Sequence, residues 1–137
     1  MINVVITSFK EPETISKAIE AFLHQDLDED YDITISAPDE ETLKVVRQYK
    51  NKHKKINIFR DPGKGKSFAL NLLLPKLKGR IIVLSDGDVF VKENSMKYII
   101  RQFEDERFGC VTGRPVSSDS RRDIFGYWSH LLCDAGA

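Results

Sequence analysis

The sequence predicts an α/β fold, with a mostly parallel β-sheet and helices on both of its faces. Four short runs rich in Val and Ile alternate with longer stretches in which apolar residues recur at helical spacing. This alternation is typical of βαβ units. Ligands of such sheets bind at the carboxyl ends of the strands, so we look for a functional site among the residues that follow each strand.

The first part of the chain predicts two strand–helix units. A buried strand covers Ile2–Thr7, and Pro12 suits the first turn of the helix that follows it. A second strand covers Ile33–Ala37, and Pro38 opens the next helix, which ends in the basic tail Lys50–Lys55. The first helix is indicated by apolar residues at helical spacing, namely Ile15, Ala18, Ile19, Phe22 and Leu23.

The middle of the chain predicts two more strands with a helix between them. The third strand is Ile56–Phe59, and a helix over Phe68–Leu73 ends before Pro75. Gly79 marks a turn, and Ile81–Leu84 is the most apolar of the four strands.

The last part of the chain predicts two helices and a candidate fifth strand. Asn94 or Ser95 caps a helix that continues through Phe103. Gly109–Thr112 is the strand candidate, and Ile124–Leu132 has the pattern of a final helix.

The composition is that of one globular domain spanning residues 1–137. Apolar residues make up 41% and charged residues 31%, and 21 Lys and Arg balance 21 Asp and Glu, so no nucleic acid partner is expected. Cys110 and Cys133 are too few for a disulfide scaffold and have no zinc-site spacing. There is neither a signal peptide nor an apolar run near the ~20 residues of a membrane span, so we expect no transmembrane segment and a cytoplasmic location.

The loop "DPGKGKS" (residues 61–67) looks like a phosphate-binding loop but matches neither common motif. A Walker loop would need Gly where Arg60 stands, and a dinucleotide fingerprint would need a third Gly where Phe68 stands. What remains is a Gly-rich turn with Lys64 and Lys66 at a helix N-terminus, which suits an anion. A surface turn with solvated lysines is the alternative.

Two carboxylates follow the fourth strand. Asp86 and Asp88 flank Gly87, and hard oxygen ligands of this kind suit Mg²⁺ or Mn²⁺. Two acids this close are costly to bury unless a cation offsets their charge. A solvated Asp-Gly turn is one alternative, and a haloacid-dehalogenase-like phosphatase is another. That phosphatase class also needs later lysine and paired-acid motifs on further strands, and Asp119, Asp123 and Asp134 form no adjacent acidic pair.

Four segments, taken in order, resemble the family-2 glycosyltransferases of the GT-A fold. They are "VVITSFKEPETI" (residues 4–15), "GKSFALN" (65–71), "IIVLSDGDVFV" (81–91) and "GCVTGRP" (109–115). The chain departs from the family where Thr7 and Lys10 replace a Pro and an Asn.

The resemblance implies a nucleoside-diphosphate sugar as donor and Mn²⁺ or Mg²⁺ as cofactor. Asp88 would bind the metal, and Asp86 would hold the metal or the ribose. Lys66 would lie near the base or the diphosphate, with Lys64 a weaker candidate. The nucleoside would be bound by Thr7, Ser8, Glu11 and Asp39, with Asp39 contacting the base. Thr7 and Ser8 could equally satisfy backbone groups at the strand end.

The resemblance also implies a catalytic base in an acceptor-binding part of the protein. We expect that base beyond Ala137, because the pair Glu104-Asp105 comes too early in the chain. The chain would then be the donor half of a transferase that acts on a glycan or a lipid-linked acceptor at the membrane periphery. Two alternatives are a non-catalytic nucleotide-sugar-binding module and a nucleotidyltransferase, which would need a Gly-rich, Arg-bearing loop after the first strand.

Overall fold

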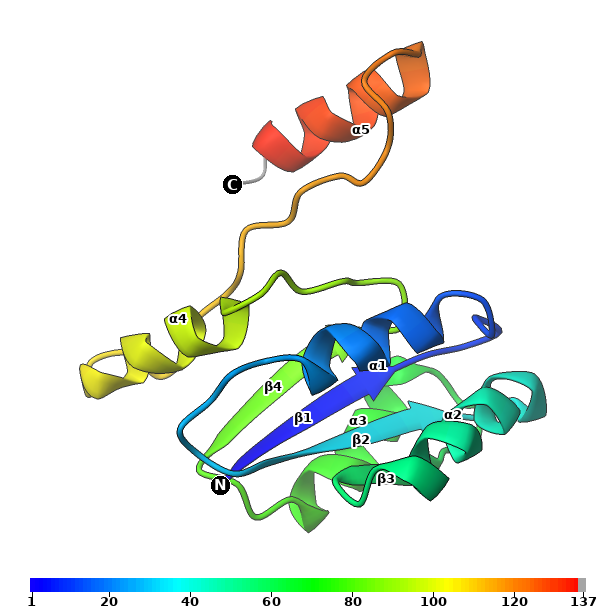
Figure 1. Cartoon of the computed structure of the whole chain (residues 1–137), viewed down its shortest axis with the longest axis vertical. Coiled ribbons are helices and arrows are strands. Elements are labelled where there is room, and N and C mark those ends of the chain that lie inside the picture. Colours follow the sequence, from blue (N-terminus) through cyan, green and yellow to red (C-terminus); the bar gives the residue numbers. More distant parts are fainter. Residues whose placement is uncertain (136–137) are drawn as a thin grey trace. The chain divides into compact units, whose positions relative to one another are not determined.

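Four parallel strands form one sheet in the computed structural model, which describes residues 1–135. The strands are β1 (Ile2–Thr7), β2 (Tyr31–Ala37), β3 (Ile56–Arg60) and β4 (Ile81–Asp86). They lie in the order β3-β2-β1-β4, and all three neighbouring pairs are parallel (Figure 1). The predicted parallel sheet and its four strands are confirmed.

The connections between the strands reverse direction beside β1. The helices α1 (Ile15–Leu23) and α2 (Glu40–Lys52) carry the chain outward from β1 to β3, and α3 (Lys66–Leu73) with the short 3₁₀ helix η1 (Leu74–Lys76) carries it back to β4. Right-handed crossovers place α1 and α2 on one face of the sheet and α3 on the other (Figure 1). The reversal between β1 and β4 is a switch point, where open α/β sheets bind their ligands.

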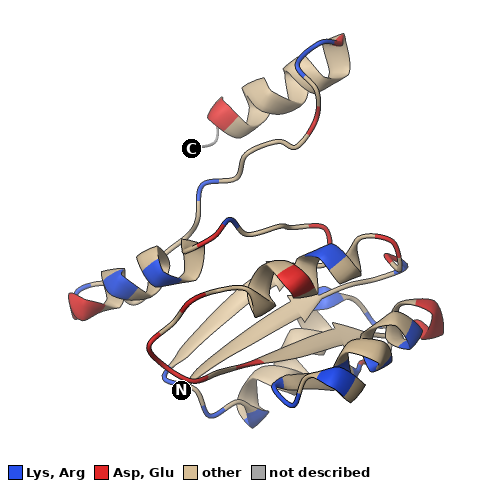
Figure 2. Ribbon diagram, in the orientation of Figure 1, with Lys and Arg blue, Asp and Glu red and all other residues tan. Residues whose placement is uncertain are grey.

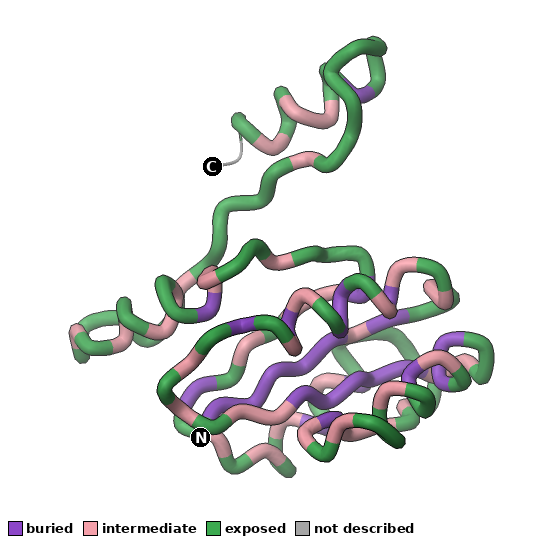
Figure 3. The backbone as a smooth tube through the Cα atoms, in the orientation of Figure 1, coloured by how far each residue is buried: buried purple, intermediate pink, exposed green. Residues whose placement is uncertain are grey.

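The hydrophobic core lies around β1 and β2, which are buried along most of their length (Figure 3). β4 is at the edge of the sheet, and its Ile82 and Leu84 are exposed. Burial of each large aliphatic side chain contributes about 1.5–3 kcal/mol. Among the largest fully buried side chains are Phe22, Ile2, Ile6, Ile15, Ile19, Ile33, Ile35, Leu43 and Ile56.

Two helix starts differ from the prediction. α1 begins at Ile15, so Pro12 lies in the turn before the helix and not in its first turn. α2 begins at Glu40, with Asp39 as its N-cap, because the Asp39 carboxylate accepts the N–H of Thr42. Pro38 therefore precedes the cap.

Charge along α2 follows the helix dipole. Acidic Glu40 and Glu41 occupy its first turn, and basic Lys50 and Lys52 occupy its last turn (Figure 2). The helix ends at Lys52, earlier than predicted, because His53 has an extended backbone that leads into β3.

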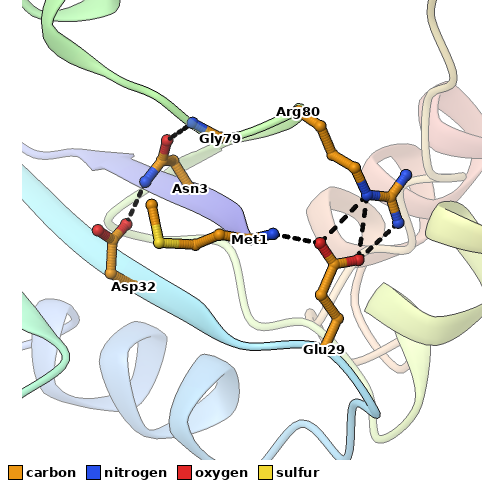
Figure 4. A network of polar contacts seen from close by, with 6 residues as sticks. All are labelled: Met1, Asn3, Glu29, Asp32, Gly79 and Arg80. Carbon is orange, nitrogen blue, oxygen red and sulfur yellow. Dashed lines mark hydrogen bonds and ion pairs between the residues drawn. The ribbon is translucent and has the colours of Figure 1, made fainter.

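A polar network ties together the amino ends of three strands (Figure 4). Glu29, in the loop before β2, forms ion pairs with the Met1 ammonium and with Arg80. Nearby, Asn3 donates to Asp32 at 2.6 Å and accepts the Gly79 N–H at 2.6 Å. These contacts fix the end of the sheet that lies opposite the candidate site.

The chain divides into two units, Met1–Ile100 and Arg101–Ala137, and each is described by itself. α4 (Ser95–Arg101) belongs mostly to the first unit, and the second contains the 3₁₀ helix η2 (Gln102–Glu104) and α5 (Ile124–Ala135). The single domain over residues 1–137 stays a prediction.

The predicted strand at Gly109–Thr112 is wrong. The structure gives this segment no regular hydrogen-bonding pattern, and three of its four residues are exposed. An isolated strand is unstable without a partner and an apolar face to bury, and this short segment has neither among the described residues. The final helix is confirmed and is longer than predicted. Within residues 1–135, no helix combines the length and the apolar character that crossing a bilayer requires.

Candidate functional site

A cavity of about 510 Å³ opens at the carboxyl ends of the four strands. Its volume lies in the range typical of small-molecule sites. Residues that follow each of the four strands, together with the first turn of α3, line it. They are Thr7, Ser8, Phe9, Glu11, Ser36, Pro38, Asp61, Gly63, Gly65, Lys66, Ala69, Asp86 and Asp88.

The two aspartates that follow the fourth apolar run both line this cavity. Asp86 is the last residue of β4, and Asp88 follows it across Gly87. The Thr7 hydroxyl donates to Asp86 Oδ1 at 2.7 Å, and the Gly87 N–H donates to the Thr7 carbonyl at 2.8 Å. The end of β1 therefore fixes the turn that carries both carboxylates.

Lys66 contributes a positive charge to the same place. Its ammonium, from the first residue of α3, forms an ion pair with Asp86. Partial burial pushes the pKa of Asp86 upward, but the hydrogen bonds from Lys66 and Thr7 outweigh burial and lower that pKa below its usual value. Asp86 is therefore ionised at neutral pH and attracts cations.

The N-terminus of α3 is open toward the cavity. The first turn of any helix leaves N–H groups without intrahelical partners, and Gly65 at the N-cap has no side chain to cap them. Gly65 has φ of 97°, which favours glycine at this position. These N–H groups and Lys66 together suit an anionic group such as a phosphate.

The turn after β1 forms another part of the cavity wall. Ser8 is buried, and its hydroxyl donates to Glu11 Oε2 at 2.8 Å. A Cβ atom at Gly87 would lie 2.5 Å from both Glu11 Oε2 and Ser8 Oγ. The turn after β1 and the acidic turn after β4 are thus packed directly against each other, which requires glycine between the two aspartates.

Asp61 and Ser36 belong to the cavity but were missed by the sequence analysis. Asp61 follows β3, where it accepts the Ser36 hydroxyl at 3.1 Å and the Gly63 N–H at 2.8 Å. The signal that could have found them is the position of each residue at the carboxyl end of a parallel strand. Phe9, 61% exposed, lies on the same cavity wall.

Asp39 does not line the cavity, and neither does Lys64, the weaker of the two lysine candidates. Asp39 Oδ1 accepts the Lys10 N–H at 2.9 Å, and its Oδ2 accepts the Thr42 N–H at 2.9 Å. Partial burial raises the pKa of Asp39, but these hydrogen bonds lower it below its usual value. The other predicted residues, Thr7, Ser8, Glu11, Lys66, Asp86 and Asp88, all line the cavity.

The two aspartates fit a divalent cation that shares its ligands with a bound substrate. No group of three or more His, Cys, Asp or Glu that could hold a metal occurs within residues 1–135. The ion pair between Asp86 and the Lys66 ammonium shows that this position accepts a cation. Two carboxylates would then need diphosphate oxygens and water to complete the coordination, as Mg²⁺ commonly does.

Comparison with solved structures shows a shared fold. The mannosyltransferase PcManGT from Pyrobaculum calidifontis, solved with GDP-Man and Mn²⁺, superimposes with a TM-score of 0.73 at 20% identity, over 82% of this chain and 36% of that one. TarS from S. aureus, solved with UDP-GlcNAc, superimposes with a TM-score of 0.63 at 18% identity, over 90% of this chain and 39% of that one.

The curated relatives match a smaller part of this chain than the solved structures do. The β-monoglucosyldiacylglycerol synthases of Trichormus variabilis and of Nostoc sp. are each 25% identical over 89 residues, which is 63% of this chain and 19% of theirs. The chain thus matches about a fifth of the length of these relatives.

The family profile described as "Glycosyl transferase family 2" matches residues 3–131. This match includes the carboxyl ends of all four strands and every residue that lines the cavity. The protein therefore belongs to glycosyl transferase family 2 and has the GT-A fold of its structural neighbours.

Proposed function

We propose that this chain binds a nucleoside-diphosphate sugar together with Mn²⁺ or Mg²⁺ and supplies the donor site of a glycosyltransferase. The observation that carries the proposal is the cavity at the switch point between β1 and β4. Cation- and anion-binding groups line it beside β4, and hydrogen-bonding groups suited to a nucleobase line it beside β2 and β3.

The width of the sheet suits an extended nucleotide. Asp61 follows β3 and Asp86 ends β4, so the two residues are separated by three strand spacings. Three spacings amount to roughly 14 Å, which is comparable to the length of a nucleoside diphosphate. We therefore place the base near Asp61, the ribose across the end of β1, and the diphosphate near Asp86.

The diphosphate end combines both signs of charge. A cation bound by Asp86 and Asp88 would stabilise the negative charge that develops on the departing diphosphate. Lys66 and the N–H groups at the start of α3 would bind phosphate oxygens from the other side. Thr7 would keep Asp86 oriented through the hydrogen bond between them.

The base end offers an acceptor and an apolar wall. The Asp61 carboxylate can only accept hydrogen bonds when ionised, so it favours a base that donates one, such as the ring N–H of uracil or guanine. Phe9 and Pro38 supply apolar surface against which a base can pack. The GDP-Man and UDP-GlcNAc in the two structural neighbours agree with this choice of base.

A lipid is the proposed acceptor of the sugar. The names of the curated relatives include a glucosylated diacylglycerol, which favours a lipid acceptor over a soluble glycan. Such an acceptor suits the expected location at the cytoplasmic face of a membrane, which stays a prediction.

Calorimetry with UDP-GlcNAc and GDP-mannose tests the proposal, with and without Mn²⁺. We expect both to bind, one more tightly than the other because base and sugar differ, and each to bind more tightly with Mn²⁺. Release of UDP or GDP in the same samples would distinguish an active transferase from a non-catalytic binding module. Failure of both nucleotide sugars to bind in the presence of Mn²⁺ would overturn the proposal.

A further inference from the structure

Lys10 has a backbone conformation that its side chain does not favour. Its φ is 56°, in the left-handed region, where residues other than Gly, Asn and Asp are uncommon. For lysine this conformation is disfavoured by about tenfold. Something in the surrounding structure must therefore hold Lys10 there.

The N-terminus of α2 holds this turn through two hydrogen bonds. Asp39 Oδ1 accepts the Lys10 N–H at 2.9 Å, and the Thr42 hydroxyl accepts the Glu11 N–H at 3.2 Å. Thr42 is fully buried, and its own N–H donates to Asp39 Oδ2. A single carboxylate thus caps α2 and anchors the turn after β1 at the same time.

The anchored turn is the one that faces the donor cavity. Ser8, Phe9 and Glu11 line the cavity on either side of Lys10, which itself does not. Ser8 and Glu11 also pack against Gly87, between the two aspartates. A change in the backbone at Lys10 would therefore move groups at both the nucleoside end and the metal end of the site.

We propose that Asp39 is a positioning residue for the donor site, which holds Lys10 in the left-handed conformation and so fixes the Ser8–Glu11 turn. Asp39 acts on the nucleotide only through this turn, and not by contact with the base. The inference rests on the proposed function, because the affected quantity is nucleotide affinity. If the turn is in the binding conformation only part of the time, the apparent Kd rises in inverse proportion to that fraction.

The variant Asp39→Ser separates the two roles of the carboxylate. Serine is as good an N-cap as aspartate, but its one hydroxyl replaces two oxygens, so the Lys10 N–H loses its acceptor. Calorimetry on the whole protein in the presence of Mn²⁺ measures the affinity for UDP and for GDP. Both affinities should fall by the same factor, about threefold to tenfold. If Asp39→Ser does not fold, Asp39→Asn keeps the shape with only one acceptor oxygen.

Two substitutions of Lys10 test whether the lost affinity can be restored, and each is the control for the other. Asn tolerates the left-handed conformation and Ala does not, and both remove the lysine charge. In the Asp39→Ser background, Lys10→Asn should restore most of the affinity, whereas Lys10→Ala should not. Restoration by both, or by neither, would overturn the proposal.

Hydrogen exchange provides a readout that needs no nucleotide. In Asp39→Ser, amides of residues 8–11 should exchange about tenfold faster than in the wild type, and Lys10→Asn should reverse the change.

If neither nucleotide binds the wild type, the proposed function fails, yet hydrogen exchange still tests whether Asp39 anchors the turn. Loss of affinity for only one nucleotide would indicate direct base contact. Unchanged exchange and affinity in Asp39→Ser, which keeps the cap, would reduce Asp39 to a helix cap, and either result would overturn the proposal.

Discussion

Lys66 and Asp86, which lie 20 residues apart in the sequence, form an ion pair across the candidate donor cavity. Lys66 comes from the first turn of α3 and Asp86 from the end of β4, so the pair joins the two elements on which a diphosphate would lie. A bound diphosphate would offer the lysine a second negative partner, and a bound cation would offer the aspartate a second positive one.

Lys66 is predicted to bind the diphosphate and not the nucleoside. Lys66→Ala should weaken the binding of UDP by about tenfold, the effect of one hydrogen bond to a charged group. The binding of uridine should be almost unchanged. Calorimetry with both ligands measures this difference. Lys64→Ala is the matched control, since Lys64 lies in the same loop but does not line the cavity. Equal losses for UDP and uridine would argue against a phosphate role.

Asp61 is predicted to accept a hydrogen bond from the nucleobase. Asp61→Ala should weaken the binding of uridine and of UDP by the same factor, about tenfold, because a carboxylate acceptor for the base is lost. Pyrophosphate in the presence of Mn²⁺ should bind the variant as it binds the wild type. A variant that loses pyrophosphate binding as well would place Asp61 at the wrong end of the cavity.

Gly87 is predicted to be essential for the contact between the two turns. In Gly87→Ala the new Cβ would lie 2.5 Å from Ser8 Oγ and 2.8 Å from Ser8 Cβ, so the turn after β1 must shift. Overpacking of this kind costs about 1–3 kcal/mol of unfolding free energy. Urea unfolding would measure that cost, and UDP affinity should fall with it.

Gly109→Ala is the control for this variant, because a Cβ atom built at Gly109 meets no atom within 4 Å beyond Gly109 itself and its two chain neighbours. It should leave both stability and UDP affinity unchanged. If Gly87→Ala behaves like Gly109→Ala, the two turns are not in the tight contact described above.

Glu29 is predicted to make stability depend on pH. Hydrogen bonds from Arg80 and from the amino terminus lower the pKa of Glu29 to about 2. Since the pKa is lower in the folded state, the contribution of Glu29 is fully present above the ordinary Glu pKa of about 4.3. It is lost as the pH falls from there through the folded-state value of about 2.

Thermal unfolding of wild type and Glu29→Gln at several pH values tests this prediction. The wild type should have the higher Tm at pH 6, and the difference should shrink as the pH approaches 2. Asp28→Asn, one residue away in the same loop, should show no such convergence. A constant difference between Glu29→Gln and the wild type at every pH would contradict the assignment.

The sheet was predictable from sequence because its strands are local features. Ile2–Thr7 is a short run rich in Ile and Val, Ile81–Leu84 is wholly apolar, and burial in a parallel sheet is what such runs require. Gly109–Thr112 is a weaker candidate, with Cys110 and Val111 as its apolar residues, and it is not a strand. Whether such a run becomes a strand depends on a partner, which its own residues do not specify.

The site was predictable only where the residues form a recognisable motif. Asp86 and Asp88 stand together after a strand, and both line the cavity. Asp61 and Ser36 are single polar residues 25 positions apart, and only the pairing of β2 with β3 brings them together. The cap at Asp39 has a local signal, an Asp after Pro at the start of a helical pattern, whereas its bond to the Lys10 N–H joins residues 29 positions apart and has no such signal.

Binding of Mn²⁺ in the presence of UDP tests the central claim most directly, and electron paramagnetic resonance can follow it as loss of the free-ion signal. The wild type should bind Mn²⁺ together with UDP. Asp88→Asn should weaken the binding of Mn²⁺ by more than about tenfold, which is the lower limit for residues that only orient metal ligands. Glu93→Gln, in the segment after the same strand, should bind Mn²⁺ like the wild type. Equal Mn²⁺ affinity in the wild type and Asp88→Asn would contradict the account.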